Sequence, residues 1–378
     1  MNTITELVLY RRVPERPSLE SFATVPAGTG SFDTWRAEPG NQMKAIVFHA
    51  HGGVENLKYE EIPAPTPAPD EVLIRVKAVS LNGFDPMMLM GTTSLKTPFP
   101  MSPGGDFAGE IVALGSSGDS STWKVGDRVC PYPYIEGRGM TGETLPGACR
   151  ELVTMPVTNL LRMPVGLSFV DAAALPIAYG TALRMMTTRG AIRAGEKVLI
   201  LGATGGVGTC CVQLAAAAGA EVIACGSADW KLSKLKEIGA TQVIDTSKED
   251  ILKAVRDRFG RPRYLGGGGV DVVVNYLGGD TWVPSLKTLR HQGRLLVCGA
   301  TAGYAPAEDL RYIWSFELQI IGSDGWTYED QTALMNMVVE GKLKPVIHSA
   351  RPLSETPQAL QELIDRKVFG KSVLTIPD

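Results

Sequence analysis

The sequence lacks a long hydrophobic run and a strong excess of either charge. Its apolar stretches fall well short of the roughly 20 residues that a membrane-spanning helix needs. Its 37 basic and 40 acidic side chains give a formal net charge of −3, so we expect no nucleic-acid partner and no membrane binding. Only the short apolar segment Leu7–Tyr10 precedes Arg11 and Arg12, which is not typical of a secretory signal. We therefore predict a cytoplasmic protein.

Cysteine and histidine are also scarce. The chain has six cysteines and four histidines among its 378 residues. Cys210 and Cys211 are adjacent, but the cysteines do not show the paired spacing of a zinc-binding lobe. A disulfide between Cys130 and Cys149 is not expected in a cytoplasmic chain. We interpret the thiols as small apolar core groups.

The length and the order of the apolar patterns predict two domains. β-Branched runs separated by proline and glycine fill residues 43–165, strand-like and helix-like segments alternate through residues 166–315, and strand character returns in residues 316–378. Such alternation builds a doubly wound parallel sheet. We predict an α/β fold in which this sheet is inserted in a β-rich domain made from both ends of the chain. Residues 1–42 are interpreted as an N-terminal extension, a surface arm.

The most informative segment runs from Val198 to Thr209. A short β-branched strand enters a glycine-rich turn and continues directly into the helix-forming stretch Val207–Ala218. The free N–H groups and positive dipole at the start of such a helix favour a pyrophosphate. Glycines in the turn let the phosphate and the next strand approach closely. We predict a dinucleotide site rather than a purely structural turn, with contacts from Gly205, Gly206, Val207 and Gly208.

The end of the next strand, Glu221–Cys225, indicates which dinucleotide binds. An NAD site usually carries an acidic residue there to hold the ribose hydroxyls. This chain has Gly226 and Ser227 instead, followed by Lys231, and a hydroxyl with a cation suits a 2′-phosphate. The carboxylate of Asp229 would repel a phosphate and so argues against NADPH, unless this side chain caps the following helix. We predict NADPH with Ser227 and Lys231 at the phosphate; the alternative is that Lys231 is a solvated surface lysine.

Five motifs occur in a characteristic order along the chain. They are Met43–Val47, Val125–Val129, Ala174–Ala182, Gly202–Gly208 and Leu296–Ala300. As an ordered set they resemble the medium-chain dehydrogenase/reductase superfamily, in particular its zinc-independent, quinone-oxidoreductase-like branch. The resemblance covers nearly everything from Met43 onward. It implies a GroES-like catalytic domain joined to a Rossmann NADPH-binding domain, with the active site in the cleft between them.

The resemblance also bears on metal binding. In the zinc alcohol dehydrogenases of this superfamily, a Cys, a His and a second Cys or Asp hold the catalytic metal. The corresponding places here look like Asn82, Asp106 and Ile177. An amide, one carboxylate and an alkyl chain do not supply three good zinc ligands. We therefore predict that the protein binds no metal.

The predicted absence of a metal limits the chemistry. Without a Lewis acid, reduction of an isolated ketone is difficult because alkoxide charge builds up on one oxygen. An enone, enal or quinone is easier, since hydride adds to the β-carbon and the charge spreads into an enolate. The resemblance places Asn82 beside the nicotinamide, where its amide can donate to the substrate carbonyl; the alternative is an asparagine that fixes a loop.

The proton donor stays open at this point. Relatives that reduce enoyl thioesters often carry a Tyr acid shortly after the Asn-x-x-Asp motif. This chain reads Pro86–Ser94 in that region, without a tyrosine. Tyr132, Tyr134, Tyr179 or water are the candidates for this role.

Five further residues are expected at the cofactor. Doubly wound sheets bind ligands at the carboxyl ends of their strands, which selects Asn275, Gly299 and Thr301. The resemblance places Thr181 near the nicotinamide carboxamide. Lys371 precedes the last predicted strand and is expected to close over the cofactor.

The leading prediction is a zinc-independent, NADPH-dependent reductase that transfers hydride to an α,β-unsaturated carbonyl or a quinone. The alternatives are a zinc-independent alcohol or carbonyl dehydrogenase and a non-catalytic NADPH-binding protein. The segment Glu317–Gly322 is apolar on alternate residues, and relatives pair edge strands at this place. We therefore also predict a homodimer that acts on a small-molecule substrate.

Overall fold

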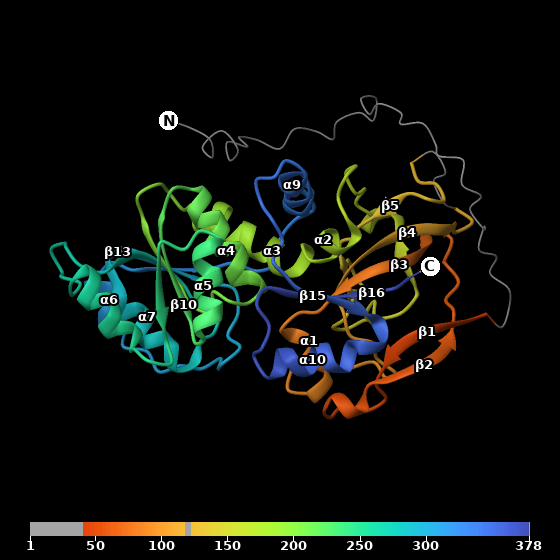
Figure 1. Ribbon diagram of the computed structural model, residues 1–378, viewed down its shortest axis with the longest axis horizontal. Helices are drawn as coiled ribbons and strands as arrows, with labels where there is room; N and C mark the ends of the chain where they lie inside the picture. The colour runs from red at the N-terminus through yellow and green to blue at the C-terminus, as the bar shows by residue number, and fades with distance from the viewer. Residues whose placement is uncertain (1–40, 118–121, 378) are drawn as a thin grey trace.

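The computed structural model describes residues 41–117 and 122–377. The predicted N-terminal arm lies outside these ranges, apart from Asn41 and Gln42. The described chain forms two lobes, a nucleotide-binding sheet with its helices and a β-rich lobe (Figure 1). Helices α2 (Phe169–Ala173) and α3 (Pro176–Leu183) lie between them. Within the described ranges, no helix has both the length and the apolar character that crossing a membrane requires.

The nucleotide-binding sheet has six parallel strands in the order β11-β10-β9-β12-β13-β14. They are β9 (Lys197–Ile200), β10 (Glu221–Gly226), β11 (Gln242–Asp245), β12 (Val270–Val274), β13 (Leu289–Val297) and β14 (Gln319–Gly322). The order reverses between β9 and β12, and doubly wound sheets bind their ligand at such a switch point. The predicted parallel, doubly wound sheet is confirmed.

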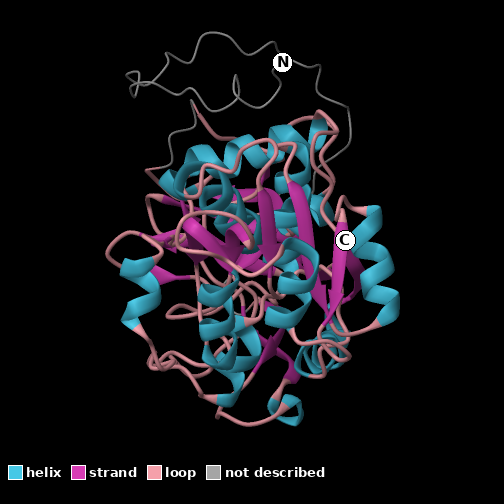
Figure 2. Cartoon of the chain, turned by 90° about the vertical axis from the view of Figure 1, so that its left-hand side faces the viewer, coloured by secondary structure: helices cyan, strands magenta, loops and turns pink. Residues whose placement is uncertain are grey.

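Alternate residues of each central strand explain why helices cover both faces of this sheet (Figure 2). In β9, Val198 and Ile200 pack in the core that includes helix α4 (Gly206–Ala217). Leu199 packs on the opposite face with helices α6 (Ile251–Phe259) and α7 (Trp282–Thr288). Because side chains alternate along a strand, an uninterrupted apolar run requires cover on both faces.

The β-rich lobe is built from both ends of the described chain. Its main sheet has the order β15-β16-β3-β4-β5, and β8 pairs with β3. These strands are β3 (Glu71–Ser80), β4 (Asp106–Leu114), β5 (Arg128–Val129), β8 (Leu152–Pro156), β15 (Ile347–Pro352) and β16 (Lys371–Thr375). The late strand β16 runs antiparallel to the early strand β3, and both lie side by side in Figure 1. The two-ended β-rich domain expected from the sequence is therefore present.

The remaining elements complete the two lobes. Two short hairpins, β1 (Gln42–Val47) with β2 (Lys58–Pro63) and β6 (Tyr134–Ile135) with β7 (Gly139–Met140), belong to the β-rich lobe. The other α-helices are α1 (Phe84–Met90), α5 (Asp229–Glu237), α8 (Leu310–Ser315), α9 (Tyr328–Val339) and α10 (Thr356–Ile364). A π-helical turn at Arg184–Arg189 continues α3.

One expected boundary is displaced. The sequence patterns place the return to the β-rich domain at residue 316, yet β14 at 319–322 pairs with β13 in the nucleotide-binding sheet. Its alternating apolar pattern suits either kind of sheet, so only the pairing partner decides where it belongs. The nucleotide-binding sheet therefore extends to Gly322.

Candidate functional site

The glycine-rich turn between β9 and α4 has no room for side chains at two of its positions. A Cβ on Gly208 would lie 2.4 Å from the carbonyl oxygen of Gly202, and a Cβ on Gly206 would lie 2.7 Å from Cδ of Lys371. Gly202 has a φ of +66°, and its carbonyl accepts a hydrogen bond from the Tyr276 hydroxyl. Helix α4 begins at Gly206 without a side-chain cap, so its first N–H groups can bind an anion. The turn fits the pyrophosphate of a dinucleotide.

The C-terminal segment packs directly against this turn. The N–H of Gly370 donates to the Thr204 carbonyl at 2.9 Å, and Gly205 forms a bridge with Gly370. The next residue, Lys371, is buried, and its ammonium donates to Oδ1 of Asn82. The stem of Lys371 thus lies next to the glycine turn, while its ammonium group is engaged by Asn82. A contact of Lys371 with the cofactor stays a prediction.

Asn82 lies at the centre of a buried polar group. Its Nδ2 donates to Oδ2 of Asp106 at 2.9 Å, and its backbone N–H donates to Oδ2 of Asp85 at 2.6 Å. Asp85 also accepts from the N–H of Gly104 at 2.7 Å. An asparagine amide carries two N–H donors and one oxygen. Lys371 donates to the oxygen and Asp106 accepts one N–H, so the second N–H of Asn82 has no partner among the described residues.

The cluster of Asn82, Asp85, Asp106 and Lys371, here called the inner cluster, is shielded from water. Burial raises the pKa of Asp85 to about 6. Burial also raises the pKa of Asp106 and lowers the pKa of Lys371, while the attraction between these two groups opposes both shifts. The Lys371 nitrogen lies 3.6 Å from Oδ2 of Asp106. The cluster therefore holds Asn82 in one orientation through charge-assisted contacts.

The three places that the resemblance matches to zinc ligands are Asn82, Asp106 and Ile177. Oδ1 of Asp106 accepts the N–H of Ile177 at 2.9 Å, so both of its oxygens have protein partners. A Cβ on Gly105 would lie 2.8 Å from Cδ1 of Ile177, which shows that an alkyl group fills this space. Among the residues that the structure describes, no group of three or more His, Cys, Asp or Glu side chains could hold a metal. The donor set does not fit zinc.

A small hollow of about 10 Å³ lies beside Asn82. It is lined by Asn82, Phe84, Asp85, Gly105, Thr141, Gly142, Glu143 and Ile177. A hollow of this volume holds about one water molecule, so a substrate can enter only if the surrounding side chains move apart. Glu143 was not among the residues selected from the sequence. The available signal was an acidic residue inside the glycine-rich stretch Gly139–Gly147.

The candidate tyrosines do not line this hollow. Tyr132 donates to the Trp326 carbonyl at 2.7 Å and stacks on Tyr328. The Tyr179 hydroxyl is buried and accepts from the N–H of Val346 at 2.8 Å. Burial raises the pKa of both phenols, which weakens them as acids. Tyr134 is 51% exposed.

The predicted contacts at the carboxyl edge of the sheet have different outcomes. The side-chain amide of Asn275 is buried, and both its nitrogen and its oxygen have protein partners. Nδ2 donates to the hydroxyls of Thr281 and Ser285, and Oδ1 accepts from the N–H groups of Leu277 and Gly278. It orders its own turn and has no free group for a cofactor. Gly299 and Thr301 are exposed at this edge, and Thr181 is half-buried on α3. These three positions are open to a ligand and remain predictions.

An open hollow also lies at this edge, after β13 and β14. It is lined by Arg184, Arg189, Val297, Cys298, Gly322, Ser323 and Asp324. The hollow is at the strand ends where doubly wound sheets bind ligands. It lies at the same edge of the sheet as the glycine turn that follows β9.

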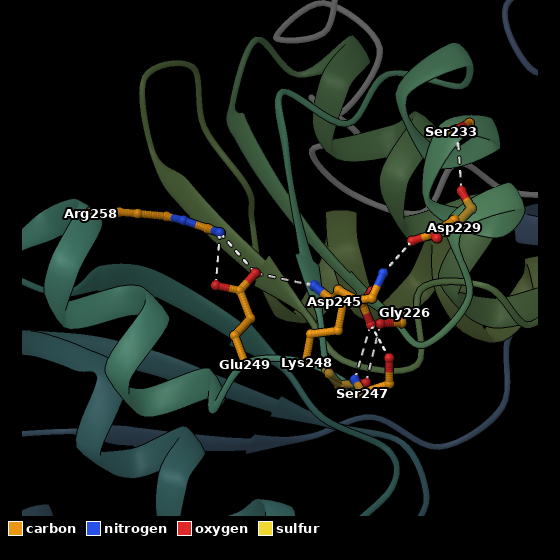
Figure 3. Close-up of polar contacts among 9 residues, drawn as sticks. Gly226, Asp229, Ser233, Asp245, Ser247, Lys248, Glu249 and Arg258 are labelled. Atoms are coloured by element: carbon orange, nitrogen blue, oxygen red, sulfur yellow. Dashed lines mark hydrogen bonds and ion pairs between the residues drawn. The ribbon is translucent and has the colours of Figure 1, made fainter.

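The opposite end of the predicted cofactor site lies at the end of β10. Figure 3 shows the group formed there by Asp229, Asp245, Ser247 and Lys248, here called the outer cluster. Asp229 and Lys248 are exposed, and Asp245 is partly buried. The ammonium nitrogen of Lys248 lies 2.7 Å from Oδ1 of Asp229 and 2.9 Å from Oδ2 of Asp245. The alternative role of Asp229 as a helix cap is wrong, because the N-cap of α5 is Ala228. Asp229 is instead paired with a cation, which weakens its repulsion of a phosphate.

Lys231 has protein partners in this structure. Its ammonium donates to the carbonyls of Arg366 and Val368, the latter at 2.8 Å, and the residue is 6% exposed. Burial lowers its pKa. The alternative of a solvated surface lysine is therefore wrong, whereas its contact with a 2′-phosphate stays a prediction that must use its third N–H. Ser227 is exposed beside it.

Comparison with known proteins agrees with this architecture. The family model described as alcohol dehydrogenase GroES-like domain matches residues 68–165, and the one described as zinc-binding dehydrogenase matches residues 206–340. Human quinone oxidoreductase is 30% identical over 344 residues, covering 88% of this chain and 98% of that protein. Acryloyl-coenzyme A reductase of Sulfurisphaera tokodaii is 30% identical, covering 87% of this chain and 98% of that protein.

Solved structures give the same result. A crystal structure described as an NAD-dependent alcohol dehydrogenase superposes with a TM-score of 0.80 at 32% identity, covering 89% of this chain and 100% of the other. Both the parallel sheet and the β-rich lobe are thus shared with known oxidoreductases. The chain belongs to the medium-chain dehydrogenase/reductase superfamily, in its quinone-oxidoreductase-like branch, and is an oxidoreductase.

Proposed function

We propose that the protein is a cytoplasmic, zinc-independent reductase that uses NADPH to reduce an α,β-unsaturated carbonyl compound or a quinone. The observation that carries the proposal is the inner cluster. It leaves one N–H of Asn82 for a substrate at a hollow that Ile177 also lines. The resemblance matches these two residues to metal ligands of the zinc alcohol dehydrogenases. The names of the human and archaeal relatives, a quinone oxidoreductase and an acryloyl-coenzyme A reductase, point to the same class of acceptor.

The residues of this chain would divide the work as follows. Gly205, Gly206 and Gly208 hold the pyrophosphate, and the bound cofactor supplies hydride. Asn82 donates its second amide N–H to the substrate carbonyl, where negative charge develops as hydride reaches the β-carbon. Asp106 and Lys371 hold the amide in that orientation. A single neutral donor is enough only if the substrate delocalises the charge, which favours an enone or quinone over a simple ketone.

The preference for NADPH rests on the end of β10. Ser227 and Lys231 stand where a carboxylate would mark an NAD site, and Lys248 neutralises the nearby Asp229. We expect Lys231→Ala to weaken NADPH binding far more than NADH binding, since only NADPH carries the 2′-phosphate charge. Isothermal titration with both cofactors measures this difference, and Lys236→Ala on the exposed face of α5 is the control. Equal losses for the two cofactors would contradict the assignment.

The proposed reaction is tested directly by the steady-state oxidation of NADPH. Purified protein is assayed with a panel of enones, quinones and simple ketones, with and without a chelator, and its zinc content is determined. We expect turnover with enones or quinones, little turnover with ketones, and no effect of the chelator. Preferred turnover of simple alcohols or ketones would support a dehydrogenase, as the alcohol dehydrogenase neighbour suggests. Tight NADPH binding without turnover of any acceptor would support a non-catalytic role.

We also propose a homodimer that pairs through β14. This strand is the last of the six-stranded sheet, and its residue Ile320 is 41% exposed. An exposed edge strand with apolar side chains is otherwise an aggregation hazard. Light scattering at micromolar concentration should show a dimer, and Ile320→Lys should shift it toward a monomer. A wild-type monomer under these conditions would contradict the proposal.

A further inference from the structure

We propose that Glu143 is the proton donor of the reaction, delivering a proton to the α-carbon of the substrate after hydride has reached the β-carbon. The assignment rests on the proposed reduction of a conjugated carbonyl compound. It adds the acid that this reaction requires, and it replaces the tyrosines considered from the sequence.

The position of Glu143 is set by a tight turn of the backbone. The N–H groups of Glu143, Thr144 and Leu145 all donate to the Met140 carbonyl at 3.0–3.1 Å. Gly142, which precedes Glu143, has a φ of +82°, and a Cβ there would lie 2.7 Å from the N–H nitrogen of Gly105. The turn is therefore pressed against the strand that carries Asp106, and Glu143 faces the same small hollow as Asn82.

The side chain of Glu143 is the available acid in this hollow. Its carboxyl group makes no hydrogen bond or ion pair to any described residue, whereas its backbone is firmly held. Asp85 also lines the hollow, but its oxygens accept the N–H groups of Asn82 and Gly104. Asp106 is occupied by Asn82 and Ile177. Three carboxyl groups lie near Asn82, the proposed hydrogen-bond donor to the substrate carbonyl. Of these three, only that of Glu143 has no partner among the described residues and is free to gain and lose a proton.

The surroundings favour the protonated form. Partial burial, together with the smaller effect of the carboxylates of Asp85, Asp324 and Asp106, raises the pKa of Glu143 to about 7. These groups approach from three elements: α1, the loop after β14, and β4. The cation of the inner cluster, Lys371, is engaged by Asn82 and Asp106. Glu143 can therefore carry a proton near neutral pH, where an ordinary glutamate cannot.

The balanced step is simple. Hydride forms a C–H bond at the β-carbon, the C=C π pair moves to the α-carbon and carbonyl oxygen, and Asn82 stabilises that oxygen. The α-carbon then takes the proton from the Glu143 carboxyl, which leaves a carboxylate and a saturated ketone. Solvent reprotonates Glu143 before the next turnover. Hydride and proton thus arrive from different groups, with no further reductant needed.

The first measurement does not depend on turnover. Protein labelled with ¹³C at the glutamate carboxyl is titrated by NMR without cofactor, and the Glu143 signal is identified by its loss in Glu143→Gln. We expect a midpoint near 7. Unfolding by urea across pH gives a second readout: a folded pKa raised above 4.5 means that the folded protein binds the extra proton, so stability falls as pH rises between these values. Glu143→Gln should make this slope shallower, and the part that remains comes from Asp85 and Asp106, whose pKa values burial also raises.

The second measurement is catalytic. Wild-type kcat with an enone should fall as pH rises through the Glu143 midpoint, because the acid form is lost. Glu143→Gln should lower kcat by about a hundred- to ten-thousandfold, with a much smaller change in the NADPH dissociation constant, and Glu143→Asp should recover part of the rate. Glu136→Gln, an exposed glutamate of the preceding loop, is the matched control and should behave as wild type.

The outcomes separate the two proposals. If the wild-type protein fails to oxidise NADPH with every acceptor tested, the proposed function is overturned, and the assignment of Glu143 is overturned with it. A wild-type enzyme that is active, with unchanged kcat and pH profile in a folded Glu143→Gln variant, overturns the assignment of Glu143 alone. A Glu143 midpoint near the ordinary glutamate value would also overturn it. If Glu143→Gln does not fold, Glu143→Asp must still shift the pH profile, and an unshifted profile counts against the assignment.

Discussion

The inner and outer clusters lie at opposite ends of the predicted cofactor site and are made of similar groups. In the outer cluster, hydrogen bonds from Ser247 and Lys248 lower the pKa of Asp245 to about 2. In the inner cluster, burial raises the pKa of Asp85 to about 6 despite two backbone hydrogen bonds. The pKa values of two aspartates therefore shift in opposite directions in the two clusters. The balance between burial and hydrogen bonding decides the sign. Burial outweighs two backbone hydrogen bonds at Asp85, whereas the hydrogen bonds from Ser247 and Lys248 outweigh burial at Asp245.

The comparison also predicts where charge matters for stability. Removing one partner of a buried ion pair leaves an uncompensated charge in the interior, whereas water replaces a lost partner at the surface. Substitutions in the inner cluster should therefore be costly, and equivalent substitutions in the outer cluster should be nearly silent. The following experiments test this contrast in order of decreasing effect.

The largest effect is expected for Lys371→Met. This change leaves Asp106 buried without its cation, and loss of one partner of a buried pair typically costs about 3–5 kcal/mol. Urea denaturation at pH 7.5 measures the loss in the free energy of unfolding. At lower pH the loss should shrink, because Asp106 can then be protonated. A variant as stable as wild type would mean that Asp106 does not need the Lys371 cation in the folded protein.

The second largest effect is expected for Asn82→Ala, which should slow hydride transfer to the substrate. A lost hydrogen bond to developing oxyanion charge costs roughly 2.7–4 kcal/mol, or about a hundred- to a thousandfold in rate. Single-turnover hydride transfer to an enone should slow by this amount, while the NADPH dissociation constant changes only a few-fold. If hydride transfer is unchanged and only the melting temperature falls, Asn82 serves to fix its loop.

Lys231→Ala should have an intermediate effect on stability. The change removes the donor to the carbonyls of Arg366 and Val368, and an unsatisfied buried group costs about 1–3 kcal/mol. Thermal unfolding without cofactor measures it, and limited proteolysis should show faster cleavage near residues 366–368. Lys236→Ala, which is exposed on the same helix, serves as the control. Equal stability of both variants would show that the two carbonyls find other partners.

The smallest effect is expected for Lys248→Met. Its partner Asp229 is exposed, and Asp245 keeps its hydrogen bonds from Ser247. The free energy of unfolding at neutral pH should therefore change little, and the difference should shrink at high salt. The stabilisation by Asp245 is present above its unfolded pKa and is lost only as pH falls through about 2. A loss as large as that of Lys371→Met would break the contrast between the two clusters.

Much of the nucleotide-binding half could be predicted from the sequence. The order of strand, glycine turn and helix at Val198–Ala218 depends on neighbouring residues, and the structure reproduces it as β9 and α4. The continuous apolar strands indicated a sheet covered on both faces, which the six parallel strands confirm. The oxidoreductase family followed from ordered motifs, and relatives at 30% identity confirm it.

The contacts that link distant segments could not be predicted in this way. Lys371 meets Asn82 across 289 residues, Lys231 is engaged by carbonyls near the C-terminus, and Glu143 reaches the hollow because its turn packs on Gly105. Local patterns determine which residues form strands, turns and helices, since those hydrogen bonds lie close along the chain. Burial and the partner of a charged side chain depend on which segments meet in space, so only the tertiary structure decides their chemistry.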